Sequence, residues 1–138
     1  MFNQKVDVLT NAANERLMHG GGIAGQFVKR AGWAFQEWCI DKILDDGTKT
    51  LAVGESVFCP PFNLEGQCKQ IANIVGPFYE DDKDEECRNI LRKAIFDLLF
   101  LCECKSHTSI AIPAVSAGIF RFPKRACAES IYEGVIAF

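Results

Sequence analysis

Two stretches rich in glycine and small residues, far apart in the sequence, have the composition of an anion-binding site. The first, Asn11 to Gly25, is NAANERLMHGGGIAG, and the second, Ser116 to Phe120, is SAGIF. The glycines at 20–22 have no Cβ, so a ligand can closely approach their backbone N–H groups. An apolar helical pattern begins at Ile23, which puts these glycines at a predicted helix N-terminus, where free N–H groups and the helix dipole favour phosphate. The pattern predicts a pyrophosphate site built mainly from backbone.

Strands must carry these two stretches, since each follows an apolar run that ends in small or polar residues. Strand patterns are found at residues 6–9, 55–59, 70–75 and 109–113. The first run is predicted to end at Thr10 and Asn11. The second is stopped by Pro60 and Pro61, which indicates an edge strand or a hairpin arm. The last, apolar throughout, is typical of a strand that is covered on both faces.

Helical patterns alternate with these strands. Residues 23–44 are interrupted at Gly32, so they form two helices or one kinked helix that ends near Asp45, Asp46 and Gly47. Further helices are predicted over residues 87–102 and 125–136, and the acidic run at 80–86 is expected to lead into the first of these. The alternation predicts an α/β fold with a largely parallel or mixed sheet, in which ligands bind beyond the carboxyl ends of the strands.

The composition limits the class of protein. The chain has 138 residues, 49% of them hydrophobic and 24% charged, which suits one soluble globular domain. A net charge of −3 without a long basic run argues against nucleic-acid binding, and the lack of a long apolar segment argues against a membrane span. Seven cysteines, an odd number without a CxxC pair, predict buried reduced thiols and no metal site. We therefore expect a cytoplasmic or nuclear protein.

One alternative comes from the glycines alone. Gly20, Gly22 and Gly25 match GxGxxG, a pattern of nicotinamide-dinucleotide oxidoreductases. In those enzymes the glycines turn directly from strand to helix and an acidic residue ends the next strand. Here a polar stretch separates the predicted strand from the glycines. Asp41, Asp45 and Asp46 fall in or after a helical pattern and not at the end of a strand. The oxidoreductase is therefore the weaker interpretation.

Three blocks taken together resemble the macro domain family. They are VDVLTNAANERLMHGGGIAG from Val6, NIVGP at 73–77 and AIPAVSAGIFRFP at 111–123, and the resemblance extends from Val6 to Ala128. It implies a three-layer α/β/α fold with a mixed, mostly parallel central sheet. It also implies binding of ADP-ribose, free or attached to protein as a mono-ADP-ribosyl group, with no cofactor. Some members hydrolyse the mono-ADP-ribosyl linkage or deacetylate O-acetyl-ADP-ribose.

The resemblance also implies roles for particular residues. Ala12 and Asn14 would approach the distal ribose, and residues 20–23 would lie along that ribose and the diphosphate. Residues 116–120 would enclose the diphosphate from the other side, with Phe120 near the distal ribose. The expected ligand-binding residues are Ala12, Asn14, Gly20, Gly21, Gly22, Ile23, Ala24, Ser116, Ala117, Gly118, Ile119 and Phe120.

Asn14 is the candidate catalytic residue. One hydrolase branch of the family carries an aspartate where this chain has Ala24. The branch that resembles viral macro domains has alanine there and relies on the asparagine and on the ligand's own phosphate. Asn14 is not basic at pH 7, so it could only position ribose or water. The residues alone also allow Asn11 and Asn14 to be turn or cap residues, and His19 to be structural and not an acid–base group.

The chain departs from the family at both ends. Residues 1–4 do not supply the usual upstream acid that recognises adenine. We expect residues 1–138 to form a single macro-like domain without the usual first strand or strands and the final strand and helix. Exposed sheet edges would then be covered by a partner domain or a dimer. A degenerate domain that serves only in protein contacts is the alternative function.

Overall fold

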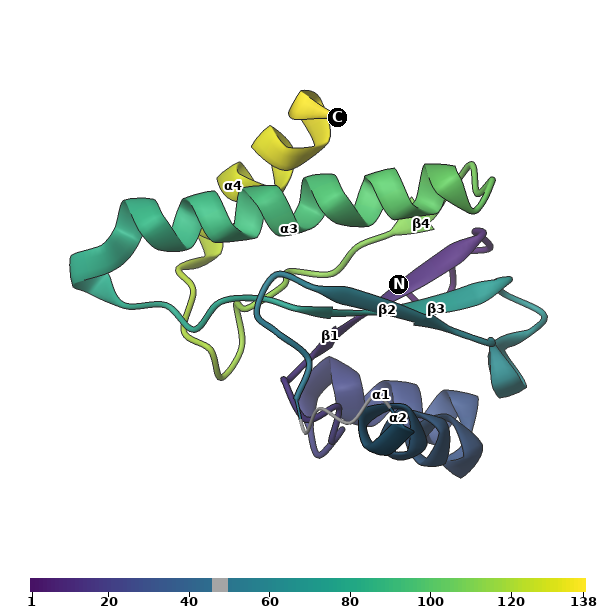
Figure 1. The fold of residues 1–138 in the computed structure, drawn as a ribbon. Coiled ribbons are helices and arrows are strands. Elements are labelled where there is room, and N and C mark those ends of the chain that lie inside the picture. Colours follow the sequence, from purple (N-terminus) through teal and green to yellow (C-terminus); the bar gives the residue numbers. More distant parts are fainter. Residues whose placement is uncertain (46–49) are drawn as a thin grey trace.

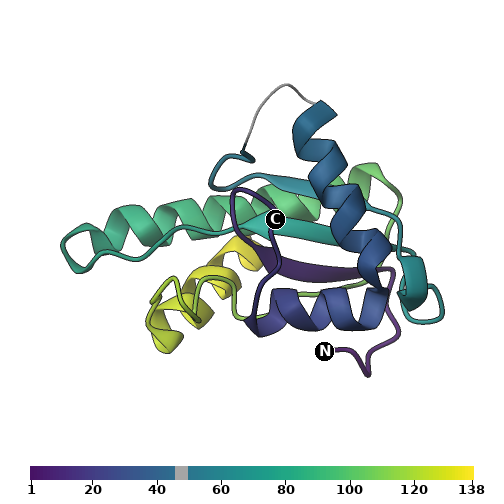
Figure 2. The same cartoon turned by 90° about the horizontal axis from the view of Figure 1, so that it is seen from below.

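A four-stranded sheet lies between two pairs of helices in the computed structural model, which describes residues 1–45 and 50–138 (Figure 1). One face is covered by α1 (Gly22–Ala31) and α2 (Trp33–Asp45), and the other by α3 (Asp84–Cys104) and α4 (Lys124–Ala137). Seen from below, α1 and α2 are on the near side of the strands (Figure 2). Two short 3-10 helices, Phe62–Leu64 and Asp81–Lys83, lie in the connections.

The sheet is mixed. Its strands are β1 (Val8–Ala13), β2 (Ser56–Cys59), β3 (Gln70–Val75) and β4 (Ile110–Ala111), and their order is β2-β3-β1-β4. Strand β1 runs parallel to both β3 and β4, while β2 is an antiparallel edge strand. The predicted three-layer α/β class and the predicted edge strand are confirmed.

The strands are buried on both faces because their side chains alternate between two cores. Val8 and Ile74 pack into the core beneath α3 and α4. Leu9 and Ile71 pack into the other core, against α1 and α2. The middle of the sheet is therefore rigidly held, and its carboxyl edge is a firm support for loops.

The prediction that the first strand ends at Thr10 and Asn11 is wrong. Strand β1 continues to Ala13, with Asn11 paired in register with Asn73 of β3. The Nδ2 group of Asn11 donates to Oδ1 of Asn73 at 3.0 Å, so two buried amides satisfy each other and the ladder is not interrupted. Strand β4 is shorter than predicted because it pairs with β1 only at Ile110 and Ala111.

The helices follow the sequence closely. Residues 22–45 form two helices separated by Gly32, whose φ of +98° is a conformation that favours glycine. Helix α2 ends at Asp45, and Asp46 and Gly47 lie outside the described residues. Helix α3 begins before the predicted Cys87, with three acidic residues in its first turn, as the charge of a helix N-terminus favours. Within the described residues, no helix has the length and apolarity needed to cross a membrane.

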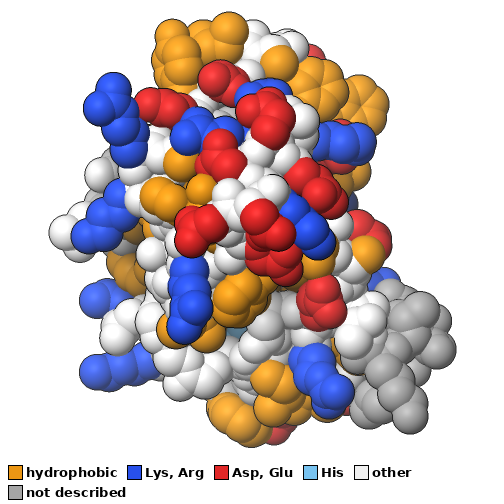
Figure 3. All heavy atoms as spheres, turned by 90° about the vertical axis from the view of Figure 1, so that its left-hand side faces the viewer, with side chains coloured by type: hydrophobic (Ala, Val, Ile, Leu, Met, Phe, Trp, Pro, Cys, Tyr) orange, Lys and Arg blue, Asp and Glu red, His pale blue; other side chains and the backbone are white. Residues whose placement is uncertain are grey.

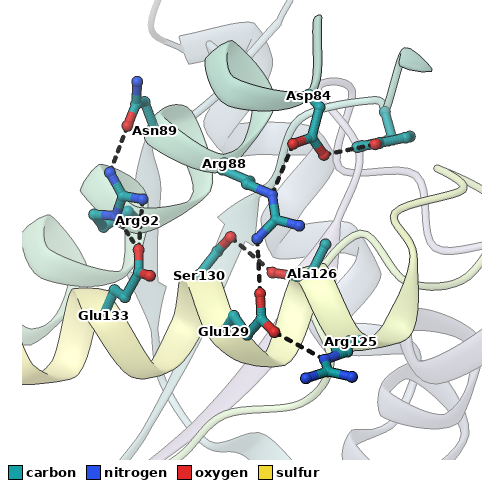
Figure 4. Close-up of polar contacts among 10 residues, drawn as sticks. Asp84, Arg88, Asn89, Arg92, Arg125, Ala126, Glu129, Ser130 and Glu133 are labelled. Atoms are coloured by element: carbon teal, nitrogen blue, oxygen red, sulfur yellow. Dashed lines mark hydrogen bonds and ion pairs between the residues drawn. The ribbon is translucent and has the colours of Figure 1, made fainter. Parts of the chain in front are cut away.

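Helices α3 and α4 are joined by ion pairs and by close backbone packing (Figure 4). Arg88 of α3 lies between Asp84 and Glu129, with nitrogen–oxygen distances of 2.9 Å to both. At Gly134 a Cβ would lie 2.9 Å from Cβ of Ile95, so only glycine allows the two helices to come this close. This contact fixes α4, and with it the loop that enters α4.

All seven cysteines are unpaired thiols, as predicted, and six of them are buried. Burial raises the pKa of Cys39 to about 12, so that thiol stays protonated at neutral pH. Among the described residues, no group of three or more metal-ligating side chains could hold a metal ion. The cysteines therefore act as packing residues in this fold.

Candidate functional site

A cavity of about 410 Å³ lies at the carboxyl ends of β1 and β3, between the loop before α1 and the loop before α4. This volume is within the usual range for small-molecule sites. The lining residues come from both glycine-bearing stretches and from the ends of the strands: Ala12, Ala13, Asn14, Met18, Gly20, Gly21, Gly22, Ile23, Ala24, Gly76, Ala114, Val115, Ser116, Gly118, Ile119 and Phe120. The fold thus brings two distant segments to opposite sides of one cavity.

All the residues expected at the site line this cavity except Ala117. The N–H of Ala117 donates to the carbonyl of Ala114 at 3.1 Å, which closes a turn. Its methyl group packs against the core under α3 and α4. Ala117 therefore supports the second loop from behind and is absent from the cavity wall.

Five lining residues were missed by the sequence analysis: Ala13, Met18, Gly76, Ala114 and Val115. Gly76 is the informative one. A Cβ there would lie 2.6 Å from Cγ1 of Val115 and would collide with Oγ of Ser116. The Gly-Pro pair that follows the buried strand at 70–75 was the available signal, because parallel strands end at the same edge of a sheet.

Both loops present backbone N–H groups that have no acceptor. In α1 the first backbone hydrogen bond runs from Gly25 N to Gly21 O at 3.0 Å, so the N–H groups of residues 22–24 find no acceptor among the described residues. No side chain caps this helix, and no acid lies in its first turn. In the second loop the N–H groups of Ser116, Gly118, Ile119 and Phe120 likewise find no acceptor in the described chain. Such paired rows of donors favour an anion.

Packing does not explain the glycines of the first loop. A Cβ added at Gly20, Gly21 or Gly22 would meet no atom within 4 Å. By contrast, a Cβ at Gly76 or Gly134 would collide with neighbouring atoms. Close packing therefore does not require glycine at residues 20–22, and the space in front of them is open.

None of the described residues that line the cavity is charged or titratable. Figure 3 views the molecule from the left-hand side of Figure 1. Acidic side chains lie mainly in its upper half, interspersed with Lys and Arg, while its lower centre shows mostly uncharged groups, drawn white and orange. Ser116 is 7% exposed, and its Oγ has no hydrogen-bond partner in the described chain. A buried hydroxyl without a partner is costly unless a ligand or water satisfies it.

Asn14 holds its own loop. Its Oδ1 accepts from the N–H groups of Arg16 and Met18, each at 3.1 Å, and its Nδ2 donates to the carbonyl of Met18 at 2.8 Å. The turn-residue interpretation is therefore confirmed. A carboxamide has two amide hydrogens, so one remains for a ligand at the cavity wall. Contact between Asn14 and a ligand stays a prediction.

His19 anchors the glycine loop from inside the core and does not line the cavity. Its N–H donates to Oε1 of Gln36 at 2.8 Å, and its ring stacks on Phe35 at a centroid distance of 4.8 Å. Its two ring nitrogens each lie 3.4 Å from a buried partner, Nδ2 of Asn11 and Sγ of Cys39. Burial lowers the pKa of His19 to about 4, so the ring is neutral at pH 7. This geometry fits the structural interpretation of His19.

Curated relatives share this sequence along most of its length, and the Macro domain family model matches residues 10–131. An O-acetyl-ADP-ribose deacetylase of Escherichia coli K12 is 33% identical over 133 residues, which are 96% of this chain and 72% of that protein. Human protein mono-ADP-ribosyltransferase PARP14 is 35% identical over 94% of this chain, and an uncharacterized Thermotoga maritima protein is 36% identical over 88%. The chain spans only 7% and 19% of these two proteins.

Solved structures agree with the sequence relatives. A variant of the Oceanobacillus iheyensis macrodomain, solved with ADPR, has a TM-score of 0.91 and 26% identity. The alignment covers 98% of this chain and 72% of that one. With the family model matching most of the sequence and the same fold in place, this chain belongs to the macro domain family.

Proposed function

We propose that this chain binds ADP-ribose, free or attached to protein, in the cavity between its two loops. The observation that carries the proposal is the pair of rows of unbonded backbone N–H groups on opposite sides of one uncharged cavity. A diphosphate offers acceptor oxygens to both rows, and the N-terminal dipole of α1 favours its negative charge. The structure of the Oceanobacillus relative with ADPR supports this choice of ligand.

The remaining wall residues suit the sugars beside the diphosphate. Asn14 keeps one amide hydrogen for a ribose hydroxyl, and Ala12 leaves room beside it. The unpartnered Oγ of Ser116 can donate to a phosphate or hydroxyl oxygen. Phe120 supplies an apolar surface on the other side, near the distal ribose.

Calorimetry with ADP-ribose and AMP tests the proposal. Gly118→Val places a side chain in open space before the N–H row of the second loop, so the fold should persist while the diphosphate is excluded. We expect affinity for ADP-ribose to fall by at least about 30-fold, since hydrogen bonds to charged groups contribute about 1.5–3 kcal/mol. AMP should bind more weakly than ADP-ribose, because it lacks the second phosphate and the distal ribose.

The matched control is Gly66→Val, at a turn glycine that also has no atom within 4 Å of an added Cβ. It should leave binding unchanged. Equal affinities of the Gly118→Val and Gly66→Val variants would contradict the proposed site. No heat with ADP-ribose at all would support the alternative that the domain serves only in protein contacts.

Hydrolysis is the second candidate, favoured by the 33% identity to an O-acetyl-ADP-ribose deacetylase. No titratable side chain is among the described residues of the cavity wall, and Ala24 supplies no acid. A reaction here would therefore need the ligand's own phosphate as base, with Asn14 positioning ribose or water. Release of ADP-ribose from a mono-ADP-ribosylated glutamate, compared with the Asn14→Ala variant, measures it. Turnover no higher than that of Asn14→Ala would indicate that the domain only binds ADP-ribose and does not hydrolyse the linkage.

The oxidoreductase alternative loses its basis in this fold. The glycines of its GxGxxG match belong to the macro-domain loop, and residues 14–19 separate them from the end of β1.

We also propose a cytoplasmic or nuclear location and a partner domain or dimer at the sheet edges. The seven free thiols support the first of these, because unpaired cysteines are typical of reducing compartments.

A further inference from the structure

A second cavity, of about 400 Å³, adjoins the first. The two share Asn14, Gly76 and Phe120 in their walls. Beyond these shared residues, the second cavity is lined by Glu15, Arg16, Val53, Val75 and Phe78. A group that leaves the first cavity between Asn14 and Phe120 therefore enters the second.

Backbone hydrogen bonds hold the walls of this second cavity in place. The N–H of Leu51 donates to the carbonyl of Glu15 at 2.6 Å, and the N–H of Gly54 donates to that of Val75 at 2.7 Å. On the opposite wall the N–H of Tyr79 donates to the carbonyl of Phe120 at 2.8 Å. The cavity is thus formed before any ligand arrives, which lowers the entropic cost of binding.

The chemistry of the second cavity differs from that of the first. Phe78 is 54% exposed, and its ring centroid lies 5.2 Å from that of Phe120, while Val53 is 41% exposed. Arg16 makes no ion pair within the described residues, and Glu15 carries the opposite charge beside it. Exposed aromatic and arginine side chains around an apolar floor are typical of surfaces that bind polypeptide. They do not resemble the backbone donors that suit a diphosphate.

We propose that the second cavity binds the polypeptide that carries the ADP-ribosyl group. The modified side chain passes between Asn14 and Phe120, and an apolar side chain next to it packs against Val53 and Phe78. The guanidinium of Arg16 donates hydrogen bonds to a carboxylate or a backbone carbonyl of the same segment. This inference rests on the proposed function, because it requires ADP-ribose in the first cavity with its distal ribose toward Asn14.

The test compares two ligands by calorimetry: free ADP-ribose, and a peptide that carries ADP-ribose through a non-hydrolysable amide on a side chain beside leucine. We expect the peptide to bind the unaltered chain at least about 5-fold more tightly, the gain from burying one apolar side chain. Val53→Glu should remove this advantage and leave the affinity for free ADP-ribose unchanged. Arg16→Glu should weaken only the peptide.

Val135→Glu is the matched control, since Val135 of α4 is 45% exposed and lies outside both cavities. It should change neither affinity. Equal binding of peptide and free ADP-ribose by the unaltered chain would overturn the inference while leaving the proposed function intact. An equal loss of affinity for both ligands in Val53→Glu would also overturn the inference, because the second cavity would then be part of the nucleotide site. Failure of free ADP-ribose to bind the folded chain would overturn the proposed function, and this inference with it.

Discussion

The two loops of the cavity present the same kind of group to a ligand but are held by different forces. The glycine loop before α1 is held by buried hydrogen bonds. Gln36 accepts from the N–H of His19 and donates to the carbonyl of Leu17, both at 2.8 Å. Asn14 closes the turn over residues 14–18 through its hydrogen bonds with Met18. This loop is therefore anchored by polar groups that need their partners.

The loop before α4 is held mainly by packing. Val115 is fully buried, and the chain at Ser116 lies so close to β3 that only glycine fits at position 76. Cys127 of α4 adds a contact from its Sγ to the carbonyl of Val115 at 3.1 Å. Steric fit and backbone hydrogen bonds, and not buried side-chain amides, set the position of this loop.

The two loops should therefore fail in different ways. A change of shape should disturb the second loop, because close-packed atoms have no room to yield. A lost hydrogen-bond partner or a change of protonation should disturb the first, because its buried groups would be left unsatisfied. Variants in each loop distinguish these two kinds of failure.

The largest effect is expected at the second loop. Gly76→Ala introduces a Cβ 2.6 Å from Cγ1 of Val115 and in collision with Ser116. Overpacking of this kind costs about 1–3 kcal/mol of unfolding free energy. Displacement of the loop should also lower the affinity for ADP-ribose by a larger factor than any first-loop variant below. Urea denaturation and calorimetry measure the two effects.

Gly66→Ala is the control for that prediction, because an added Cβ there meets nothing within 4 Å. It should leave both stability and affinity unchanged. If Gly76→Ala behaved in the same way as Gly66→Ala, close packing would not be what holds the second loop.

An intermediate effect is expected at the first loop. Gln36→Leu keeps the volume of the side chain but leaves the N–H of His19 and the carbonyl of Leu17 without partners. Each unsatisfied buried group costs about 1–3 kcal/mol, part of which is recovered by relaxation, so we expect a loss of about 2 kcal/mol in stability. Gln26→Leu, at an exposed position of α1, is the matched control for urea denaturation. Equal midpoints for the two variants would exclude a polar anchor.

The smallest effect is a pH dependence that only the first loop should have. Burial lowers the pKa of His19 from 6.5 to about 4, so between these values the unfolded chain binds a proton that the folded chain does not. Stability is therefore greatest above pH 6.5 and falls as the pH decreases toward 4, by about 1 kcal/mol between pH 7.5 and 5.5. His19→Gln removes this titration. Urea denaturation of both proteins at the two pH values isolates the contribution, and equal losses would refute it.

Much of the site could be predicted because local sequence reports local conformation. The glycines at 20–22 indicated free backbone donors, and the helical pattern from Ile23 placed them at a helix N-terminus, which the structure has one residue earlier, at Gly22. The end of β1 was predicted too early because, in the sequence alone, an asparagine at position 11 is typical of the end of a strand. Its partner, Asn73, is 62 residues away and becomes visible only in the sheet.

The amino-acid sequence alone determined which backbone segments present accessible N–H groups, since small residues and glycine decide where such groups can be approached. The three-dimensional fold decided which of these segments line the same cavity. Parallel pairing of β1 with β3 brought Gly76 beneath Ser116, and packing turned Ala117 away from the cavity. The same folding created the second cavity, because its walls are tied by hydrogen bonds between residues distant in sequence. Contacts between residues so far apart in sequence depend on the whole sheet, so no local sequence pattern predicts them.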